Sequence, residues 1–465
     1  MSEVSIMWFR RDLRLGDNPA LLAARDAAGD GAVVPVFVLD PVLWKPSGGP
    51  RRAFLLDCLK HLDEAMAGHL VVRRGDPATV IPELVAELGA NSVHIAADTG
   101  PYGRRRDAAV GAALKGTELV STGSAYAVTP GRVRKADGEP YRVFTPFARA
   151  WRAHGWRLPA TIPGAIPWMS NVDSEPLPPV PERDDLKLPA AGESAAHKSW
   201  KAFRDNKVAD YSTERNRPDL DRTSRLSPYL HFGCIHPRTL LADLADLAAL
   251  TDLARQNGRG AHTFVNEIAW REFYADVLWH QPDSARDYLQ PRLKKMAYSS
   301  GPTAEANFTA WTQGRTGYPM VDAGMRQLLA EGWMHNRVRM LVASFLIKDL
   351  HQEWTRGARW FMRHLVDGDL ASNQHGWQWV AGSGTDAAPY YRVFNPVLQG
   401  KKFDPDGDYV RRYVPELRNV EGAKGGRIHE PWELPDGLPA GYPERIVDHA
   451  DEREVALERY AAVRD

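Results

Sequence analysis

The first 130 residues alternate between two kinds of segment, and this alternation most constrains the fold. Short β-branched runs, SIMWF, AVVPVFVLD, LVVRRGD and SVHIAAD, are separated by stretches with helical spacing such as PRRAFLLDCLKHLDEAM and PATVIPELVAELG. Because parallel strands need crossover connections that are usually helices, this order predicts a doubly wound, parallel α/β sheet. Asp17, Asn18 and Pro19 follow the first run and supply cap residues and a helix-starting proline. No G-x-G-x-x-G follows it, so the fingerprint of dinucleotide binding is absent.

The rest of the chain has a different pattern. Residues 156–192 are rich in proline (LPATIPGAIP, EPLPPVPERDD) and predict a linker, whereas apolar residues from about 197 to 417 recur at helical spacing with few strand signals. After residue 419 comes a charged tail with one short helix, EREVALERYAAV. We therefore predict an α/β domain at 1–130, an interdomain linker at 131–195, an all-α domain at 196–417 and a C-terminal tail at 418–465.

Composition narrows the classes of function. A chain of 465 residues is long enough for two or three domains with their own cores. Its 59 basic residues balance 59 acidic ones, so any nucleic acid must be bound by a local patch. Two cysteines, Cys58 and Cys234, without C-x-x-C spacing, argue against a disulfide or zinc framework and for the cytoplasm. No signal peptide and no membrane-spanning run is visible, so we expect no membrane association.

Two predicted helices each carry a stripe that mixes polar or charged side chains with aromatic or sulfur-bearing ones. One stripe, in TFVNEIAWREFYADVLW, consists of Glu267, Trp270, Arg271 and Tyr274. The other, in GWMHNRVRMLVASFL, consists of Asn336, Arg339 and Met340. Taken singly, such stripes are more often core packing with ion pairs at the rim. Charged groups are rarely placed on a buried face without a partner, and this weakens the packing interpretation.

Two short segments have an unusual composition. TSRLSPYL, residues 223–230, gathers hydroxyls and an arginine before a proline, which fits a phosphate-binding turn and an ordinary helix cap equally well. DGDLASNQHGWQW, residues 367–379, shows neither a helical stripe nor strand alternation, so Trp377 and Trp379 should point in different directions from irregular backbone. Asp367 and Asp369 have no His or Cys at ligand spacing, so a pairing of Asp367 with Arg339 is as plausible as a cation, and we predict no metal site.

These segments carry a family resemblance. MWFRRDLRLGDNPAL, TSRLSPYLHFG, EIAWREFY, TGYPMVDAGMRQL, GWMHNRVRM and DGDLASNQHGWQWVAGSGTDAAPYYRVFNP strongly resemble the photolyase and cryptochrome family, and the match runs from Ile6 to about Leu417. The resemblance implies an α/β antenna domain followed by an all-α domain that binds FAD, active as FADH−. GWMHNRVRM and EIAWREFY resemble the class I photolyases, which are DNA-repair lyases for cyclobutane pyrimidine dimers. The six-four photolyases carry paired histidines where this chain has His335 and Asn336.

The resemblance assigns flavin contacts residue by residue. The matches to phosphate and ribityl contacts are Tyr211, Thr223, Ser224, Arg225, Leu226 and Ser227. Further flavin positions are Asn336, Arg339, Asp367, Asp369 and Asn373. Arg339 and Asp367 resemble the family's ion pair near the isoalloxazine ring. Asn373 matches the residue beside flavin N5, which is asparagine in photolyases.

The resemblance also implies a mechanism and a DNA interface. Excited, reduced flavin would donate an electron to a flipped-out dimer, whose cyclobutane ring splits before the electron returns. The matching catalytic positions are Glu267, Trp270, Asn336, Met340, Asn373 and Trp379. The matching DNA-contacting positions are Arg215, Glu267, Trp270, Arg271, Tyr274, Asn336, Arg337 and Gln399. Phosphate contacts by such arginines would make binding depend on salt.

Electron supply and light harvesting depart from the family pattern. Trp377 and Trp354 match the proximal and middle members of the family's electron-transfer tryptophan triad. The third region, KKMAYSSGPTAEANF, holds no tryptophan, and Tyr298 is the nearest aromatic that could replace it. GGPRRAFLLDCL and AADTGPYGRRRD resemble the subgroup with a deazaflavin (8-HDF type) antenna chromophore, and the matching positions are Phe37, Arg51 and Asp98. A glutamate typical of that subgroup is Gly100 here, so folate or no antenna chromophore is the alternative.

Two other classes of protein stay open. A cryptochrome-like blue-light photoreceptor would signal through a protein partner without repair, but Asn373, Trp270, Trp379 and the short tail argue against it. An inactive flavin-binding scaffold is disfavoured because the dimer-contacting positions are intact. We expect a monomer that acts on UV-damaged DNA containing pyrimidine dimers and has no obligate protein partner.

Overall fold

The computed structural model describes residues 3–161, 164–180, 186–250, 256–385, 391–420 and 426–463. The chain forms two compact units. Unit 1 comprises Met1–Arg183, Pro189–Asp210 and Ser224–Pro282, and unit 2 comprises Asp184–Leu188, Tyr211–Thr223 and Asp283–Asp465. The boundaries predicted at residues 130, 195 and 417 stay predictions, and the structure adds that the helices of residues 189–210 and 224–282 pack in the same unit as the sheet.

Unit 1 is built on a five-stranded parallel sheet in the order β3-β2-β1-β4-β5. The strands are β1 (Val4–Phe9), β2 (Ala32–Leu39), β3 (Val71–Arg74), β4 (Ser92–Ala97) and β5 (Glu118–Ser124). The central strand β1 is buried along its whole length, as expected of a strand covered on both faces. The chain leaves β1 first towards β2 and β3 and later towards β4 and β5, which confirms the predicted doubly wound sheet.

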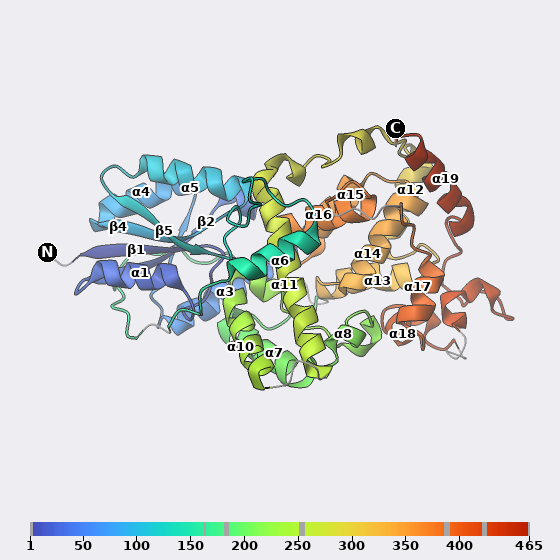
Figure 1. Cartoon of the computed structure of the whole chain (residues 1–465), viewed down its shortest axis with the longest axis horizontal. Helices are drawn as coiled ribbons and strands as arrows, with labels where there is room; N and C mark the ends of the chain where they lie inside the picture. The colour runs from blue at the N-terminus through green and yellow to red at the C-terminus, as the bar shows by residue number, and fades with distance from the viewer. Residues whose placement is uncertain are drawn as a thin grey trace. The chain divides into compact units, whose positions relative to one another are not determined.

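Helices cover both faces of this sheet. They are α1 (Pro19–Ala28), α3 (Gly49–Ala65), α4 (Pro77–Leu88) and α5 (Pro101–Ala113), with the short α2 (Pro41–Trp44) after β2. Figure 1 shows α4 and α5 together on one side of the strands and α1 on the other. Asn18 caps α1 by accepting a hydrogen bond from the N–H of Leu21, and Pro19 is its first residue, which confirms the predicted helix start.

The remaining helices of unit 1 are α6 (Phe144–His154), α7 (Gly192–Asn206), α9 (Ser227–Phe232), α10 (Pro237–Leu250) and α11 (Gln256–His280). The long α11 packs against α6 and α10, and α7 packs against α3. Cys58 in α3 and Cys234 after α9 are free buried thiols whose sulfur atoms lie 3.5 Å apart. None of the helices in the described part of the chain is both long and apolar enough to cross a bilayer.

Unit 2 is helical. Its α-helices are α8 (Tyr211–Glu214), α12 (Pro302–Gln313), α13 (Pro319–Glu331), α14 (Asn336–Ser344), α15 (Trp354–His364), α16 (Leu370–Ala381), α17 (Pro396–Phe403), α18 (Asp408–Tyr413) and α19 (His449–Ala461). A turn of π-helix, Phe345–Asp349, continues α14. Short 3₁₀ segments lie at Pro218–Leu220, Pro282–Ala285, Pro291–Lys295, Pro415–Leu417, Arg427–His429 and Pro431–Glu433. The large buried side chains Trp311, Tyr318, Trp354 and Tyr409 belong to one continuous core.

The prediction of irregular backbone in residues 370–379 is wrong, because these residues lie in α16. Asp369 caps the helix by accepting a hydrogen bond from the N–H of Ser372, and Gly382 ends it in the left-handed conformation. Two residues apart in a helix differ by about 200° in direction. Trp377 and Trp379 therefore still point to different sides, the first buried and the second half-buried.

Candidate active site

The stripe predicted on α11 is present in unit 1. Glu267, Trp270, Arg271 and Tyr274 are all half-buried, which separates them from the buried residues on the other side of the helix. The Trp270 indole is stacked on the Phe144 ring of α6, with 3.7 Å between ring centroids and 6° between ring planes. Tyr274, one turn further along, lies 5.4 Å from the Trp270 ring. The helix thus presents a carboxylate and a braced, partly exposed indole about one turn apart.

Arg271 has a different environment from its neighbours in the stripe. Its guanidinium donates hydrogen bonds to the carbonyl oxygens of Ala125, at 3.0 Å, and Leu230, at 3.1 Å. It also lies 4.4 Å from the centre of the Tyr126 ring. These contacts tie α11 to the segment after β5 and to α9, which is a structural role that the spacing alone does not reveal.

Sequence reasoning missed Glu272, which is buried next to Arg271. Its carboxylate accepts hydrogen bonds from the backbone N–H groups of Ala127 and Val128 and from the indole N–H of Trp151. Burial raises the pKa of Glu272 to about 7, although these three donors oppose the shift. Because all its partners lie in unit 1, the carboxylate fastens α11 to α6 and to the segment after β5.

The predicted ion pair of unit 2 is present. Arg339 in α14 donates to Oδ2 of Asp367 at 2.8 Å, and its Nε donates to the carbonyl of Met334 at 2.7 Å. The second carboxylate oxygen, Asp367 Oδ1, is buried and has no hydrogen-bond partner among the described residues. An unsatisfied buried acceptor is costly, so this atom suits a ligand that brings an N–H or O–H group.

Other predicted flavin residues lie on the elements around this pair. Asp369 caps α16, and Asn373 on that helix donates to the carbonyl of Ala358 at 3.1 Å and to Gln374 at 2.8 Å. Asn336 is exposed at the start of α14, where His335 serves as the cap. Met340 is half-buried on the same helix. Within unit 2 the structure therefore clusters Arg339 with Asp367 and places Asn373 one turn before Trp377.

The TSRLS run is divided between the units, with Thr223 in unit 2 and Ser224 to Ser227 in unit 1. The residue before α9, Leu226, provides no side-chain cap, so the interpretation of the run as an ordinary helix cap finds no support. Arg225 has a positive φ of 49°, a conformation uncommon outside glycine, and Ser224 Oγ accepts a hydrogen bond from the N–H of Leu226 at 3.4 Å. Residues 223–226 precede α9 without regular secondary structure, and Ser227 is the first residue of the helix.

Four of the predicted DNA contacts, Arg215, Asn336, Arg337 and Gln399, lie in unit 2. Arg337 donates to Oδ1 of Asn216 at 2.7 Å and lies 4.6 Å from the Phe403 ring. Burial lowers the pKa of Arg337, and the positive charges of Arg215 and Arg392 lower it further. Gln399 is half-buried on α17. Several positive charges therefore repel one another here, an arrangement that an anionic ligand would relieve.

The residues that match the electron-transfer positions lie in unit 2, and each contacts other aromatic side chains. Trp377 packs edge-on against Phe361 at 5.0 Å and Trp311 at 6.3 Å. Trp354 is fully buried, and its aromatic neighbour is Tyr288, at 5.8 Å between ring centroids. The hydroxyl of Tyr298 lies 2.8 Å from the hydroxyl of Tyr288. Tyr288 thus stands between Trp354 and Tyr298, which no motif or spacing indicated.

Trp379 lines a small hollow in unit 2. Its other lining residues include Lys348, Tyr391, Arg392, Phe394 and Tyr460. Lys348 is buried, donates a hydrogen bond to the carbonyl of Arg392 and lies 4.3 Å from the Tyr391 ring. Burial lowers the pKa of Lys348 to about 7.

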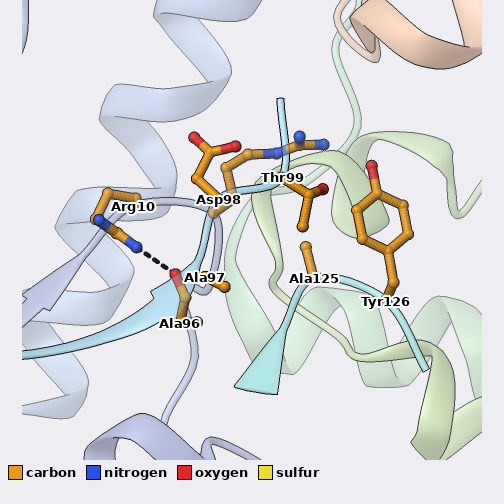
Figure 2. A pocket seen from close by; sticks show the side chains of 8 residues that line it. Arg10, Ala96, Ala97, Asp98, Thr99, Ala125 and Tyr126 are labelled. Carbon is orange, nitrogen blue, oxygen red and sulfur yellow. Dashed lines mark hydrogen bonds between the residues drawn. The ribbon is translucent and has the colours of Figure 1, made fainter. Parts of the chain in front are cut away.

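One of the three antenna residues predicted in unit 1 lines a hollow. Asp98, directly after β4, lines a hollow with Arg10, Thr99 and Tyr126, as Figure 2 shows, and Arg11 also lines it. Phe37 in β2 and Arg51 in α3 are buried and do not line it. Although burial alone acts in the opposite direction, the positive charges of Arg106, Arg11 and Arg10 hold the pKa of Asp98 below its ordinary value.

The comparisons with known proteins agree with this architecture. The family described as FAD binding domain of DNA photolyase matches residues 264–462, and the family described as DNA photolyase matches residues 5–165. The chain is 44% identical to the deoxyribodipyrimidine photo-lyase of Streptomyces griseus over 97% of both chains, and 39% identical to that of Halobacterium salinarum over 99% of both.

Solved structures give the same result. A bacterial class III photolyase from Agrobacterium tumefaciens matches with a TM-score of 0.90 and 39% identity, over 100% of this chain and 98% of that one. A Synechocystis cryptochrome matches with a TM-score of 0.87 and 26% identity, over 98% and 99%. The chain therefore belongs to the photolyase/cryptochrome family. Its full-length similarity to several proteins with the same photo-lyase name makes it an enzyme of the photolyase branch, and the matched domain makes FAD its cofactor.

Proposed function

We propose that the protein uses blue light and reduced FAD to repair cyclobutane pyrimidine dimers in DNA. Its named relatives are deoxyribodipyrimidine photo-lyases. The structural observation that carries the proposal is the α11 stripe, in which Glu267 lies about one turn from an indole braced by Phe144. A dimer extruded from the duplex offers an apolar ring edge to Trp270 and polar base edges to Glu267.

Residues of unit 2 support the flavin half of the reaction. When bound as FADH− and excited, FAD supplies one electron to the dimer and receives it back after the ring opens. The buried Oδ1 of Asp367 would accept a hydrogen bond from the flavin, and Arg339 holds that carboxylate in place at 2.8 Å. Asn373 would present its amide near N5, while Asn336, Met340 and Trp379 would contact the dimer. Glu267 would hydrogen-bond the dimer and stabilise the negative charge on it.

Binding of damaged DNA is assigned to the residues that match DNA-contacting positions. Arg215 and Arg337 would contact phosphates, and Gln399 would contact the strand near the lesion. Burial lowers the pKa of Arg337 and the positive charges of Arg215 and Arg392 lower it further, and this gathering of positive charge supports an anionic ligand at this place. Affinity for damaged DNA should fall steeply with salt despite a balanced overall charge. The class I assignment rests on GWMHNRVRM and EIAWREFY and stays a prediction, as do a monomeric state, a cytoplasmic location and the absence of an obligate protein partner.

Two supporting functions belong to the same proposal. Trp377, Trp354 and Tyr298 would pass electrons to the flavin when it has become oxidised. The antenna chromophore would be a deazaflavin bound near Asp98, Phe37 and Arg51, and folate or none is the alternative. Release of the chromophores by denaturation, followed by mass spectrometry, identifies which one the purified protein carries.

The direct test is loss of cyclobutane dimers from a UV-damaged oligonucleotide. Protein with chemically reduced flavin is mixed with the DNA under blue light, with a dark sample as control. The proposal expects light-dependent restoration of the pyrimidines. A protein that binds reduced flavin but restores none would instead be a photoreceptor of the cryptochrome kind.

A further inference from the structure

Two phenols and a carboxylate meet at the start of α15 in unit 2. The Tyr288 hydroxyl donates a hydrogen bond to Oε1 of Glu353 at 3.2 Å and lies 2.8 Å from the Tyr298 hydroxyl. The other carboxylate oxygen of Glu353 accepts a hydrogen bond from Thr355 Oγ1 at 3.0 Å, which fixes the orientation of the carboxylate. The Tyr288 ring stands edge-on to Trp354 at 81°.

Among the described residues, Trp354 and Trp377 have no acceptor to which their indole groups could lose a proton. The indole N–H groups of Trp354 and Trp377 are buried, and neither has a hydrogen-bond acceptor among the described residues. A tryptophan that gives up an electron there becomes a radical cation that keeps its proton. It remains a strong oxidant until a neighbour supplies an electron.

Tyr288 is the neighbour that can supply an electron and lose a proton together. Burial raises the pKa of Tyr288 above the usual range of a phenol and raises that of Tyr298 to about 12, so both are protonated at working pH. An oxidised phenol is a very strong acid, so its oxidation needs a base within hydrogen-bond reach. Glu353 meets this requirement at 3.2 Å.

We infer that Tyr288 is the electron donor to Trp354 and that Glu353 is the proton acceptor that makes this transfer possible. The electron moves from the Tyr288 phenol to the Trp354 radical cation and restores neutral tryptophan. The phenolic O–H bond breaks and a new O–H bond forms on Glu353, which leaves a neutral tyrosyl radical and a carboxylic acid. Tyr298 can then give its hydrogen atom to Tyr288 across their hydrogen bond. The inference rests on the proposed function, because only a photoexcited flavin that takes an electron through Trp377 creates the oxidant.

A competing branch starts from the same tryptophan. Trp377 touches Trp311, which stacks with Phe308 at 5.8 Å, and Phe308 stands edge-on to Trp360 at 6.5 Å. The indole N–H of Trp360 is buried without an acceptor in the described part of the chain. This branch therefore ends at a group that cannot release a proton, and a hole placed there returns to the flavin.

The test uses the FAD-bound protein with oxidised flavin, blue light and an external thiol, and measures the initial rate of flavin photoreduction. Glu353→Gln keeps a hydrogen-bond acceptor but cannot take the proton, and Tyr288→Phe removes the donor. Both should slow photoreduction by about tenfold. The matched control is Glu305→Gln, which removes the same charge from an exposed ion pair with Arg356 and should leave the rate unchanged. Normal photoreduction in Glu353→Gln or in Tyr288→Phe overturns the inference.

A further readout uses the wild type and does not depend on how well a variant folds. In the wild type, the decay of the tryptophan radical cation should slow in D₂O and be matched by the rise of a tyrosyl radical; no isotope effect or no tyrosyl signal overturns the inference. Trp360→Phe should show the wild-type rate of flavin photoreduction. If that variant is slow while Glu353→Gln is normal, the electron comes through the branch of Trp311 instead, and the inference is overturned. Repair with chemically reduced flavin should be normal in every variant, because it needs no electron from Tyr288. If the wild type itself repairs nothing under these conditions, the proposed function is contradicted, and the role of Glu353 is not.

Discussion

Gly357→Ala should destabilise the protein and move the proximal tryptophan of the electron chain. Gly357 lies in α15 directly under Trp377. A Cβ atom added there would stand 2.1 Å from Cη2 and 2.5 Å from Cζ3 of the indole, and 2.6 Å from Cδ2 of Leu346. Carbon atoms pack at about 3.5 Å or more, so the ring would have to retreat by about 1.4 Å.

Two opposing effects set the magnitude. Alanine in place of glycine inside a helix is worth up to about 1 kcal/mol in favour of the folded state. Overpacking a close-packed core costs about 1–3 kcal/mol, and both Trp377 and Leu346 are buried with little room to yield. The cost of overpacking is the larger effect, and we expect the free energy of unfolding to fall by about 1–2 kcal/mol. For a folding unit of this size, each kcal/mol lowers Tm by roughly 2–4 °C.

The assay is thermal unfolding of the FAD-bound protein, followed by the rate of flavin photoreduction, which should fall because Trp377 has moved. Gly376→Ala is the matched control, since it lies beside Trp377 in α16 and an added Cβ meets nothing within 4 Å. That variant should gain stability. If Gly357→Ala gains as much as Gly376→Ala, the packing argument is refuted.

Three further predictions address the site and its stability. Asp367→Asn should weaken FAD binding by about 1.5–3 kcal/mol, because a charged hydrogen-bond acceptor is lost; flavin retained through gel filtration measures it, and full retention would count against the assignment. Burial lowers the pKa of His375 from 6.5 to about 4. Between pH 6.5 and pH 4 the unfolded chain therefore binds more protons than the folded one, and the free energy of unfolding should fall by about 3 kcal/mol as pH falls through this window. Urea unfolding at several pH values measures this, and an equally steep fall of the free energy of unfolding in His375→Gln would contradict it. Glu267→Ala should lower the repair yield per absorbed photon and keep FAD, whereas Trp270→Ala should weaken binding to damaged DNA by about 1–3 kcal/mol; loss of flavin from either variant would argue against these roles.

The sheet could be predicted because its inner strands β1 and β2 are almost entirely buried. A parallel strand that is buried on both faces is mostly apolar, as VSIMWF in β1 is, and this leaves a local signal in the sequence. The start of α1 was equally local, since Asn18 and Pro19 act on the helix next to them. The stripe on α11 followed from helical spacing, and the structure keeps its four members on one half-buried face.

Helix α16 could not be predicted from the same kind of pattern, because its buried side includes polar residues. Gln378 is fully buried and donates to the carbonyls of Ser284 and Asp287, and His375 is buried with Ser284 Oγ at 2.9 Å from its Nε2. Each group is satisfied by a segment about ninety residues earlier in the sequence. A reading that equates burial with apolar residues misses such a helix.

The contacts of the candidate site were also beyond sequence reasoning when they join distant segments. Arg339 and Asp367 could be paired in advance through the family resemblance, but Tyr288 and Glu353 belong to no motif. Their hydrogen bond joins residues far apart in the chain, and only the packing of α15 against the segment before α12 brings them together. The antenna assignment stays a prediction, with Asp98 lining a hollow in unit 1 and Phe37 and Arg51 buried.

The way the chain weaves between its two units has a consequence for its synthesis. Unit 1 is complete only when Pro282 has been made, whereas Tyr211–Thr223, made earlier, belongs to a unit whose main part is Asp283–Asp465. Domains generally fold from the N-terminus as they emerge from the ribosome. The sheet and its helices should therefore fold first. Tyr211–Thr223 should stay unfolded until Asp283–Asp465 has been made. A ribosome-stalled chain long enough to place Pro282 outside the exit tunnel should be cut by protease more readily in Tyr211–Thr223 than in the sheet and its helices.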